Sequence, residues 1–508
     1  MRSQPRPQPT QAQTLVPIAT HCPVCQHRLW ADYNNFRTIT TLDAVIRLTL
    51  LIRRCPNPDC SRYRLPYRPE SEAHFALPHH EFGLDVLAAI GRLRYAEHRS
   101  VPEIHLDLTR RGVVLAQRTV SNLLDRYDEL RALSCVDPQR LESLLSDQGR
   151  IVLALDGLQP DVGHEVLWVL RDCLSGEILL AKSLLSATAD DLAALIDELK
   201  TALPKSTPIT AVVSDGQTSI RHAVARALPG VPHQLCHFHY LREAARPISE
   251  ADRHAKKVLK KRVRGVRPIE RAAEKAQEQG DDQEQAEAEI VKGYCGAVRS
   301  ALTDDRLPPL GESGLLLHDR LSRISASLDR LIQRLGGDRL PRGLLQLQRL
   351  LKRGLEETAE LWPQVREAYV WVKRVSVLLK NEAELSSEQL QQGLKRLLSQ
   401  MRRAAETSEH EAVSRSLKHL IKVSRSYWSG LFACYESEDI PRTNNDLEQA
   451  FGSHRYHERR ASGRRRASAG LVVMGSVRLI SGMATRWRPE ARLRLWPSTI
   501  KRWRGLRE

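Results

Sequence analysis

The chain has 508 residues, which at roughly 150 residues per domain predicts about three to four domains and excludes a single small binding module. Its content of 41% hydrophobic and 27% charged residues excludes a fully disordered or fibrous protein. The 78 Lys and Arg against 61 Asp and Glu give a net charge of +17, which favours a polyanionic partner, either nucleic acid or an acidic membrane surface. No apolar run approaches the ~18 residues of a membrane span and no signal peptide is evident, so we expect a soluble, cytoplasmic protein.

The amino-terminal part of the chain contains two pairs of cysteines. Residues 1–14 are rich in Pro and Gln and predict a disordered tail, and residues 15–70 predict a zinc ribbon. A strand-like segment separates the two pairs, whose four thiolates would surround Zn2+ tetrahedrally: Cys22, Cys25, Cys55 and Cys60. Because the second pair has a wider spacing than usual, His21 or His27 could replace one thiolate. The alternative is four unrelated buried cysteines.

Residues 80–130 have the periodicity of three helices. A first amphipathic helix is followed by one that starts at Ser100, where Glu103 completes a capping box. The third helix carries four polar side chains near its start that are suited to reading DNA bases: Gln117, Arg118, Ser121 and Asn122. This pattern predicts a helix-turn-helix domain whose third helix enters a major groove. The alternative is a three-helix unit that binds nothing.

From residue 150 to residue 245 the pattern becomes that of an α/β domain. Two short apolar runs predict buried strands, and they end at Asp156 and at Ser214-Asp215. The order of the predicted elements is three strands, helix, strand, helix, strand, which is the ribonuclease H-like order. Because Asp-Gly is also common in turns, each aspartate alone has an equally plausible structural role.

Residues 246–436 predict an almost entirely helical segment. Six apolar residues between Leu317 and Leu335 are spaced alternately by four and three positions, which predicts a seam buried against another helix of the same chain rather than a dimer zipper. Residues 437–480 then return to the α/β domain with a helix that carries Glu448 in its first turn. A purely structural reading makes Asn445 the N-cap and Glu448 its capping-box partner.

These residues together resemble a DDE transposase of the Mutator-like and hAT-like class, which includes bacterial insertion-sequence enzymes. The resemblance covers about residues 150 to 480 and depends on five residues: Asp156, Asp215, Cys236, His239 and Glu448. It implies a ribonuclease H-like catalytic domain interrupted by an all-helical insertion. It also implies that the three carboxylates bind Mg2+ or Mn2+, with Asp156 as the bridging ligand.

The resemblance leaves two assignments open. Asp446 and Asp161 are possible substitutes within the carboxylate set. Cys236 and His239 match a CxxH motif of the family, and they are either a structural pair or metal ligands, although two ligands are too few for a closed zinc site.

The carboxy-terminal part of the chain is strongly basic. Six arginines that follow Glu448 are predicted to contact phosphates: Arg455, Arg459, Arg460, Arg464, Arg465 and Arg466. Residues 481–508 are predicted to form a basic tail in which Trp and Arg alternate, as in segments that bind nucleic acid. The alternative in both places is a solvated basic surface.

We therefore expect a transposase that binds the terminal repeats of its own element, cleaves the DNA at the ends and joins them to target DNA. Its partners would be double-stranded DNA and further copies of the chain on that DNA, with no membrane, and its location the nucleoid region of a bacterial cytoplasm. One alternative is a noncatalytic DNA-binding regulator derived from such an enzyme. Another is a structure-specific nuclease that cuts without joining.

Overall fold

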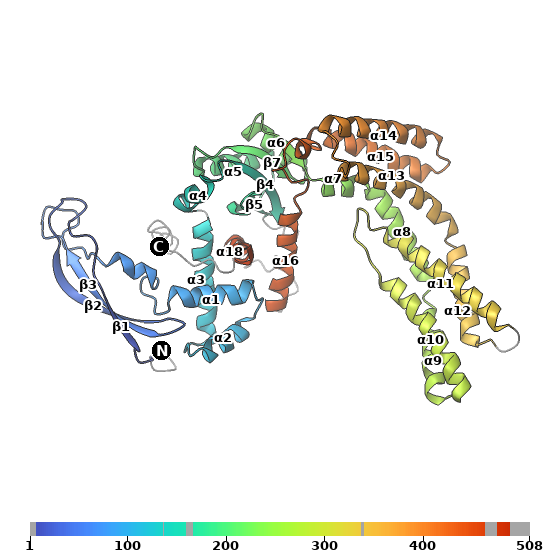
Figure 1. The fold of residues 1–508 in the computed structure, drawn as a ribbon, viewed down its shortest axis with the longest axis horizontal. Helices are drawn as coiled ribbons and strands as arrows, with labels where there is room; N and C mark the ends of the chain where they lie inside the picture. Colours follow the sequence, from blue (N-terminus) through green and yellow to red (C-terminus); the bar gives the residue numbers. More distant parts are fainter. Residues whose placement is uncertain (1–6, 136, 159–165, 337–339, 463–474, 488–508) are drawn as a thin grey trace. The chain divides into compact units, whose positions relative to one another are not determined.

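The computed structural model describes residues 7–135, 137–158, 166–336, 340–462 and 475–487 (Figure 1). The chain divides into two compact units, one formed by residues 1–231 and 444–508 and the other by residues 232–443. The fold is mixed α/β with two small sheets. Among the described residues, no helix is both long enough and apolar enough to cross a membrane.

The first sheet has the strand order β1-β3-β2, with β1 (Gln11–Leu15) parallel and β2 (Trp30–Thr40) antiparallel to β3 (Val45–Arg54). Alternate residues of β3 are fully buried, as expected for a strand with one face on a core. The predicted disordered tail is wrong for residues 11–14, which belong to β1. Because β1 pairs with a strand 35 positions along the chain, its local sequence carries no sign of the pairing.

Four helices form a module after the first sheet. A short 3-10 helix, η1 (Glu70–His74), leads to α1 (Leu84–Tyr95), α2 (Val101–Arg110) and α3 (Gln117–Cys135), as predicted, and α4 (Pro138–Leu145) follows. The predicted capping box is confirmed, because the Ser100 N–H donates a hydrogen bond of 2.7 Å to Glu103 Oε2. From the other end of the chain, α18 (Gly475–Trp487) packs against α3 and α1.

The second sheet follows the order of elements that the sequence predicts. β4 (Ile151–Leu158), β5 (Val166–Asp172) and β6 (Ile178–Leu184) are antiparallel neighbours, and β7 (Ile209–Ser214) runs parallel to β4, which gives the order β6-β5-β4-β7 within this unit. The helices between the strands are α5 (Ala189–Ala202) and α6 (Thr218–Ala227).

The two faces of this sheet have separate cores. Leu153 and Leu155 of β4 pack with residues of α5 and α6 on one face. On the other face, Ala154 and Leu158 of β4 pack with Leu447 of α16 (Asn445–Ser462) and with residues of α18. Two helices from the carboxy-terminal part of the chain therefore cover sheet residues that lie roughly 260 to 330 positions earlier.

The second unit is helical apart from one short strand. It consists of β8 (His233–Leu235), α7 (His237–Ala244), α8 (Arg246–Arg262), α9 (Val266–Gln279), α10 (Asp282–Thr303), α11 (Ser313–Leu335), α12 (Arg342–Glu356), η2 (Ala359–Leu361), α13 (Trp362–Lys380), α14 (Ser387–Thr407), α15 (Glu411–Tyr427), η3 (Trp428–Gly430) and η4 (Ala433–Tyr435). Its helices share one core, in which Leu317, Leu321 and Leu328 of α11 are fully buried. The leucine seam is thus intramolecular core, as predicted, although its last member, Leu335, is exposed.

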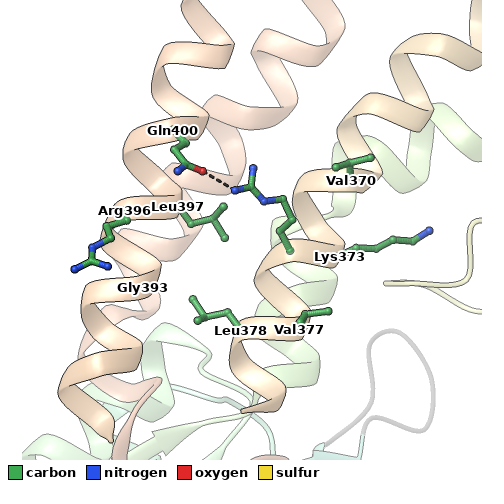
Figure 2. Close-up of a pocket in the computed structure, with 9 residues that line it drawn as sticks. Val370, Lys373, Val377, Leu378, Gly393, Arg396, Leu397 and Gln400 are labelled. Atoms are coloured by element: carbon green, nitrogen blue, oxygen red, sulfur yellow. Dashed lines mark hydrogen bonds between the residues drawn. The ribbon is translucent and has the colours of Figure 1, made fainter. Parts of the chain in front are cut away.

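A groove of about 540 Å3 lies between α13 and α14 of this unit (Figure 2). Val370, Val377, Leu378 and Leu397 form its apolar wall, and the Arg374 guanidinium reaches Gln400 Oε1 at 2.6 Å. The lining includes three cationic side chains and no carboxylate, so this groove is not a site for a metal cation.

Candidate functional site

The four predicted zinc ligands meet at one point of the amino-terminal sheet module. Cys22, Cys25, Cys55 and Cys60 place their sulfur atoms within 4.8 Å of one another. The Cys22 and Cys60 sulfurs are 3.8 Å apart, and those of Cys25 and Cys55 are 3.4 Å apart. A tetrahedron with Zn–S bonds of ~2.3 Å has edges of about 3.8 Å. The cysteine group could therefore bind a metal such as zinc with little rearrangement.

The surroundings of these thiols also suit a bound cation. The Tyr67 hydroxyl lies 3.3 Å from Cys22 Sγ, and its hydrogen bond lowers the pKa of that thiol to about 6. Burial raises the pKa of Cys55 to about 12, because a thiolate is disfavoured in an enclosed site without a counter-charge. A cation supplies that counter-charge and lets all four thiols ionise together.

The two histidines that could have replaced a thiolate lie outside this group. His21 and His27 are exposed, and the His27 ring lies 3.1 Å from the backbone carbonyl of Cys25. The wider spacing of the second pair is accommodated by a turn in which the Cys60 N–H donates to the Asn57 carbonyl at 3.2 Å. All four cysteines therefore remain available as ligands.

The two aspartates lie side by side in the first unit: Asp215 directly follows β7, as predicted, whereas Asp156 lies within β4, which continues to Leu158. Leu155 of β4 is paired in parallel register with Ser214 of β7, and Asp156 and Asp215 are the next residue on each strand path. Because neighbouring strands are about 4.8 Å apart, both carboxylates start from the same edge of the sheet. Asp156 is buried, whereas Asp215 is half-buried and accepts a hydrogen bond from the Gln217 N–H at 2.8 Å.

The helix that carries Glu448 is attached directly to the strand of Asp156. The buried Asn444 side chain donates to the Leu155 carbonyl at 3.4 Å, and Leu447 is fully buried against β4 and β5. The structural alternative in which Asn445 is the N-cap of this helix is wrong, because α16 begins at Asn445 itself. Glu448 is therefore the fourth helical residue, one position beyond the third position that a capping box requires.

The carboxylates are less tightly grouped than the cysteines. Among the described residues, Asp156, Asp215 and Glu448 do not form a set whose ligand oxygens all lie within 4.8 Å of one another. Of the two possible substitutes, Asp446 has a side chain that is 76% exposed and lies 3.4 Å from Arg171, and Asp161 lies outside the described residues. The backbone thus brings Asp156, Asp215 and the start of α16 near one edge of the sheet. Among the described residues, their carboxylate oxygens do not form a compact set of metal ligands.

Cys236 and His239 belong to the second unit. Cys236 is fully buried just before α7, and His239 lies half-buried in the first turn of that helix. Neither belongs to a group of three or more metal-ligating side chains within the described part of the chain. The geometry therefore favours the structural interpretation of this pair.

The predicted base-reading residues lie at the accessible start of α3. Gln117, Arg118 and Asn122 are exposed and Ser121 is half-buried, while Val120 and Leu123 face the core. This arrangement leaves the polar edge of the helix open to a partner.

Only part of the predicted arginine cluster can be placed. Arg460 is exposed near the end of α16. The side chains of Arg455 and Arg459, and the whole of Arg464, Arg465 and Arg466, lie outside the described residues. The expected basic tail is shorter than predicted at its start, because residues 481–487 belong to α18 and Ser481 and Thr485 are buried.

His98 and Arg486 form a cluster with His457 and Arg460 of α16, and the sequence did not predict this association. The rings of His98, which follows α1, and His457 of α16 are stacked with centroids 3.2 Å apart. Burial lowers the pKa of His98 to about 4, and the charges of His457, Arg486 and Arg460 act in the same direction. Burial also lowers the pKa of His457, and the charges of Arg486 and Arg460 act in the same direction. The sequence gives no sign of this cluster, because its members come from three separate segments.

Polar contacts also attach α18 to the module of α1, α2 and α3. The Arg478 guanidinium lies 2.9 Å from Asp125, and the Tyr127 hydroxyl lies 2.6 Å from the Thr485 hydroxyl. The Tyr95 hydroxyl donates to the fully buried carboxyl of Asp128 at 2.7 Å. α18 therefore links the predicted DNA-reading module to the sheet that carries Asp156.

The buried carboxyl of Asp128 predicts a pH-dependent stability of the first unit. Burial raises its pKa to about 7, whereas an unfolded Asp has a pKa of ~3.9. Between these values the folded state keeps a proton that the unfolded state has released. The contribution of Asp128 to stability is therefore present below about pH 4 and is lost towards pH 7, at up to about 1.4 kcal/mol per pH unit.

We expect Asp128→Asn to remove this dependence, so the free energy of unfolding of the wild type relative to the variant should decrease as the pH rises from about 4 to 7. Urea unfolding followed at several pH values measures the difference. Asp125→Asn is the control, because it removes a partner of Arg478 and leaves Asp128 in place. If the free energies of unfolding of the wild type and Asp128→Asn changed in parallel with pH, Asp128 would have the same pKa in the folded and unfolded states.

No family model matches the chain, and no curated protein matches it. A function has to be inferred from the residues and their arrangement.

Proposed function

We propose that the chain is a DDE-type DNA transposase that binds the terminal repeats of its element and catalyses metal-dependent strand cleavage and strand transfer. The observation that carries the proposal is the placement of Asp156 and Asp215 at one edge of neighbouring parallel strands, with the Glu448 helix bonded to the same strand through Asn444. This arrangement supports a site to which three residues from distant parts of the sequence would each contribute a carboxylate.

The sheet supports the proposal that the catalytic domain is ribonuclease H-like. Three antiparallel strands are followed by a strand parallel to the first, and the strand order is β6-β5-β4-β7 within the unit. In the sequence, the helical unit of residues 232–443 lies between the strands of this sheet and the Glu448 helix, as the resemblance to such transposases implies. Asp156, Asp215 and Glu448 all belong to the first unit, although this insertion lies between them in the sequence.

Asp156, Asp215 and Glu448 would hold Mg2+ or Mn2+, because hard cations prefer carboxylate oxygens and keep several waters. Two such ions activate the attacking oxygen and stabilise the leaving oxygen of a phosphate ester. The protein contributes position: Asp156 is held in a buried strand, and Leu447 and Asn444 fix the start of α16 on the sheet. The interactions that define the angle of α16 therefore also define the distance from Glu448 to the aspartates.

The DNA contacts are proposed on the same unit. Gln117, Arg118, Ser121 and Asn122 of α3 would read bases, and the basic end of α16 would contact phosphates. His457 follows Glu448 by nine residues, which is about 13 Å along a helix. One helix would thus connect the site of chemistry to a phosphate-binding cluster. We further propose a zinc ribbon at the cysteine group and action as a homo-oligomer on DNA in a bacterial cytoplasm.

The proposal is tested with purified protein, Mg2+ and labelled duplexes that contain the sequences flanking its own gene. We expect end-specific binding, strand cleavage at the ends and joining of the cleaved ends to a second DNA. Scrambled duplexes of the same length are the control. Cleavage without joining would indicate the structure-specific nuclease, and binding without cleavage would indicate the noncatalytic regulator.

A further inference from the structure

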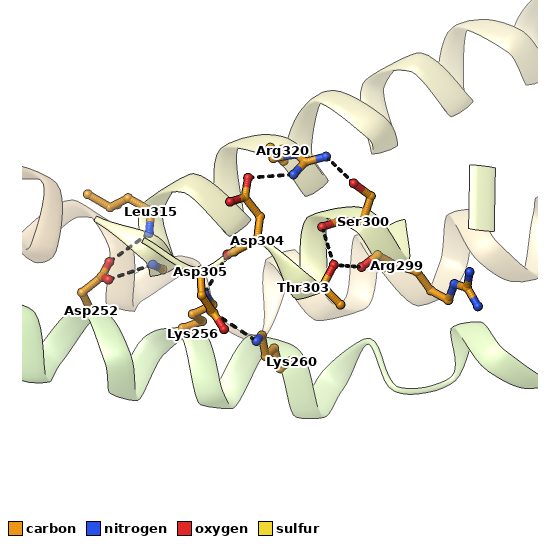
Figure 3. Close-up of polar contacts among 11 residues, drawn as sticks. Asp252, Lys256, Lys260, Arg299, Ser300, Thr303, Asp304, Asp305, Leu315 and Arg320 are labelled. Atoms are coloured by element: carbon orange, nitrogen blue, oxygen red, sulfur yellow. Dashed lines mark hydrogen bonds and ion pairs between the residues drawn. The ribbon is translucent and has the colours of Figure 1, made fainter. Parts of the chain in front are cut away.

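The helical unit contains a hollow of about 530 Å3 that plays no part in the proposed chemistry. Its walls are α8, the segment of residues 305–308, the start of α11 and Tyr369 of α13. Figure 3 shows the polar contacts that hold these walls together. All of these residues belong to the second unit.

The acidic side chains of the hollow are already engaged. Asp252 accepts hydrogen bonds from the N–H groups of Gly314 and Leu315, at 2.7 and 2.9 Å, and so caps the start of α11 (Figure 3). Asp305 is paired with Lys256, whose side chain is only 7% exposed and whose ammonium also donates to the Asp304 carbonyl at 3.0 Å. These contacts fix the walls, and Lys256 offsets the charge of Asp305.

The third acidic residue of the lining is Glu312, which forms an ion pair of 2.6 Å with Lys373. The walls contain three acidic residues in all: Asp252, Asp305 and Glu312. Each has a cationic or backbone partner, so the acids do not repel an anion as free charges would.

Besides the engaged Lys256, four cationic side chains line this side of the hollow, and we call them the cationic ridge: Arg253, Lys257, Lys260 and Arg264. Arg253, Lys257 and Lys260 are spaced by four and three residues, which places them along one face of α8, and Arg264 lies in the turn just after the helix ends at Arg262. Arg306 lies in the lining contributed by the segment after α10. Within the described chain, Arg253, Lys257, Arg264 and Arg306 form no ion pair, while Lys260 lies 3.8 Å from Asp305.

This arrangement is unfavourable for the isolated chain. Like charges at spacings of three and four residues on a helix repel each other by about 0.2 to 0.5 kcal/mol per pair. A bound polyanion would remove that repulsion. The ridge therefore has the electrostatics of a binding surface rather than of a stabilising one.

We propose that the cationic ridge binds the sugar–phosphate backbone of duplex DNA. From Arg253 to Lys260 the ridge runs for about 10 Å along α8, which corresponds to about three phosphates of one strand, and Arg264 extends the row beyond the end of the helix. A linear row of charges fits a linear polyanion better than a compact phosphorylated molecule. Because Lys and Arg at this spacing contact phosphates rather than base edges, the binding is independent of sequence.

The ridge would give the second unit a DNA contact of its own, in addition to those proposed for α3 and α16. The inference depends on DNA being the partner, as in the proposed function, and does not depend on strand cleavage. Its test therefore uses binding of a duplex with an arbitrary sequence.

The test compares two triple variants of the full chain that lose the same charge. The ridge variant is Arg253→Ala, Lys257→Ala, Arg264→Ala, and the control is Arg271→Ala, Arg402→Ala, Arg403→Ala, all exposed positions of the same unit. Binding to a fluorescent duplex is measured by anisotropy between about 50 and 200 mM salt. We expect the ridge variant to lose at least about tenfold in affinity, with the slope of log K against log salt reduced by about 0.9 for each lost phosphate contact.

The control variant should keep its affinity within about threefold and its slope nearly unchanged. Arg306→Ala, a single change in another wall of the hollow, should weaken binding in the same direction as the ridge variant and remains informative if the triple variant fails to fold. Equal losses in ridge and control variants would indicate net charge alone and overturn the inference. An unchanged slope in the ridge variant, with normal binding by the wild type, would overturn it and leave the proposed function standing. Absence of duplex binding by the wild type would overturn both.

Discussion

Conversion of Asp156 or Asp215 to Asn, or of Glu448 to Gln, is expected to abolish Mg2+-dependent strand cleavage while leaving DNA binding and thermal stability nearly unchanged. Each amide keeps the shape of the side chain and removes the charge that a hard cation requires. A loss of about 1,000-fold in cleavage rate corresponds to about 4 kcal/mol of transition-state stabilisation, which is within what a metal-ion pair supplies. Cleavage of a labelled end duplex under single-turnover conditions measures the loss.

Asp446→Asn is the matched control for this series. Asp446 lies two residues before Glu448 on α16, but its side chain is 76% exposed and its nearest charged partner is Arg171. We expect this variant to cleave at the wild-type rate. Normal cleavage by Glu448→Gln would remove Glu448 from the set, and a loss confined to Asp446→Asn would transfer its role to that residue. Unfolding temperatures measured on the same preparations separate a loss of chemistry from a loss of fold.

The sequence predicted those parts of the fold whose signals are local. The apolar runs before Asp156 and Asp215 indicated buried strands, and β4 and β7 lie there in parallel register. Ser100 and Glu103 indicated a helix start, and α2 begins at the next residue. In each case the residues that carry the signal lie within a few positions of the structure they form.

The parts that were missed depend on contacts between distant segments. β1 is a strand because it pairs with β3, and its Gln- and Thr-rich sequence has no apolar periodicity of its own. Residues 481–487 had the composition of a basic tail, yet Thr485 is buried against Tyr127, which lies 358 positions earlier. The stacked His98 and His457 come from separate elements in the same way. A pairing of this kind leaves no mark on either segment alone.

The cysteine group, in contrast, was predictable from the sequence, because the spacing of the cysteines within each pair indicates which thiols come together. Two short turns present their thiols in pairs, and the hairpin of β2 and β3 returns the second pair to the first. The donor set alone predicts the class of metal that the group could bind, since four thiolates in a tetrahedral arrangement favour zinc. The arrangement of the four thiols therefore supports a second prediction with a large expected effect, the loss of metal when two of these cysteines are replaced.

We expect the purified chain to retain about one Zn2+ per chain after dialysis and the double variant Cys22→Ser, Cys25→Ser to retain none, because two remaining thiolates cannot form a closed tetrahedral site. Elemental analysis of dialysed protein measures the metal content. Cys173→Ser is the control, because Cys173 is a free, half-buried cysteine in the turn after β5 and lies outside the group of four. This variant should keep its zinc.

Loss of this zinc should impair recognition of the element ends more than it impairs chemistry. The cysteine group and β1, β2 and β3 form cores of their own, separate from the clusters that contain β4, α5 and α16. A small module of this kind has too little apolar core to fold well without its metal. Because its core is separate, we expect loss of the metal to unfold this module and to leave the sheet of β4 folded. The double variant should therefore bind end duplexes weakly and still cleave a short duplex supplied at high concentration. If it retained its zinc, the ligands would lie elsewhere in the chain. If it bound the ends normally, the cysteine module would serve another contact and the start of α3 would read the DNA without it.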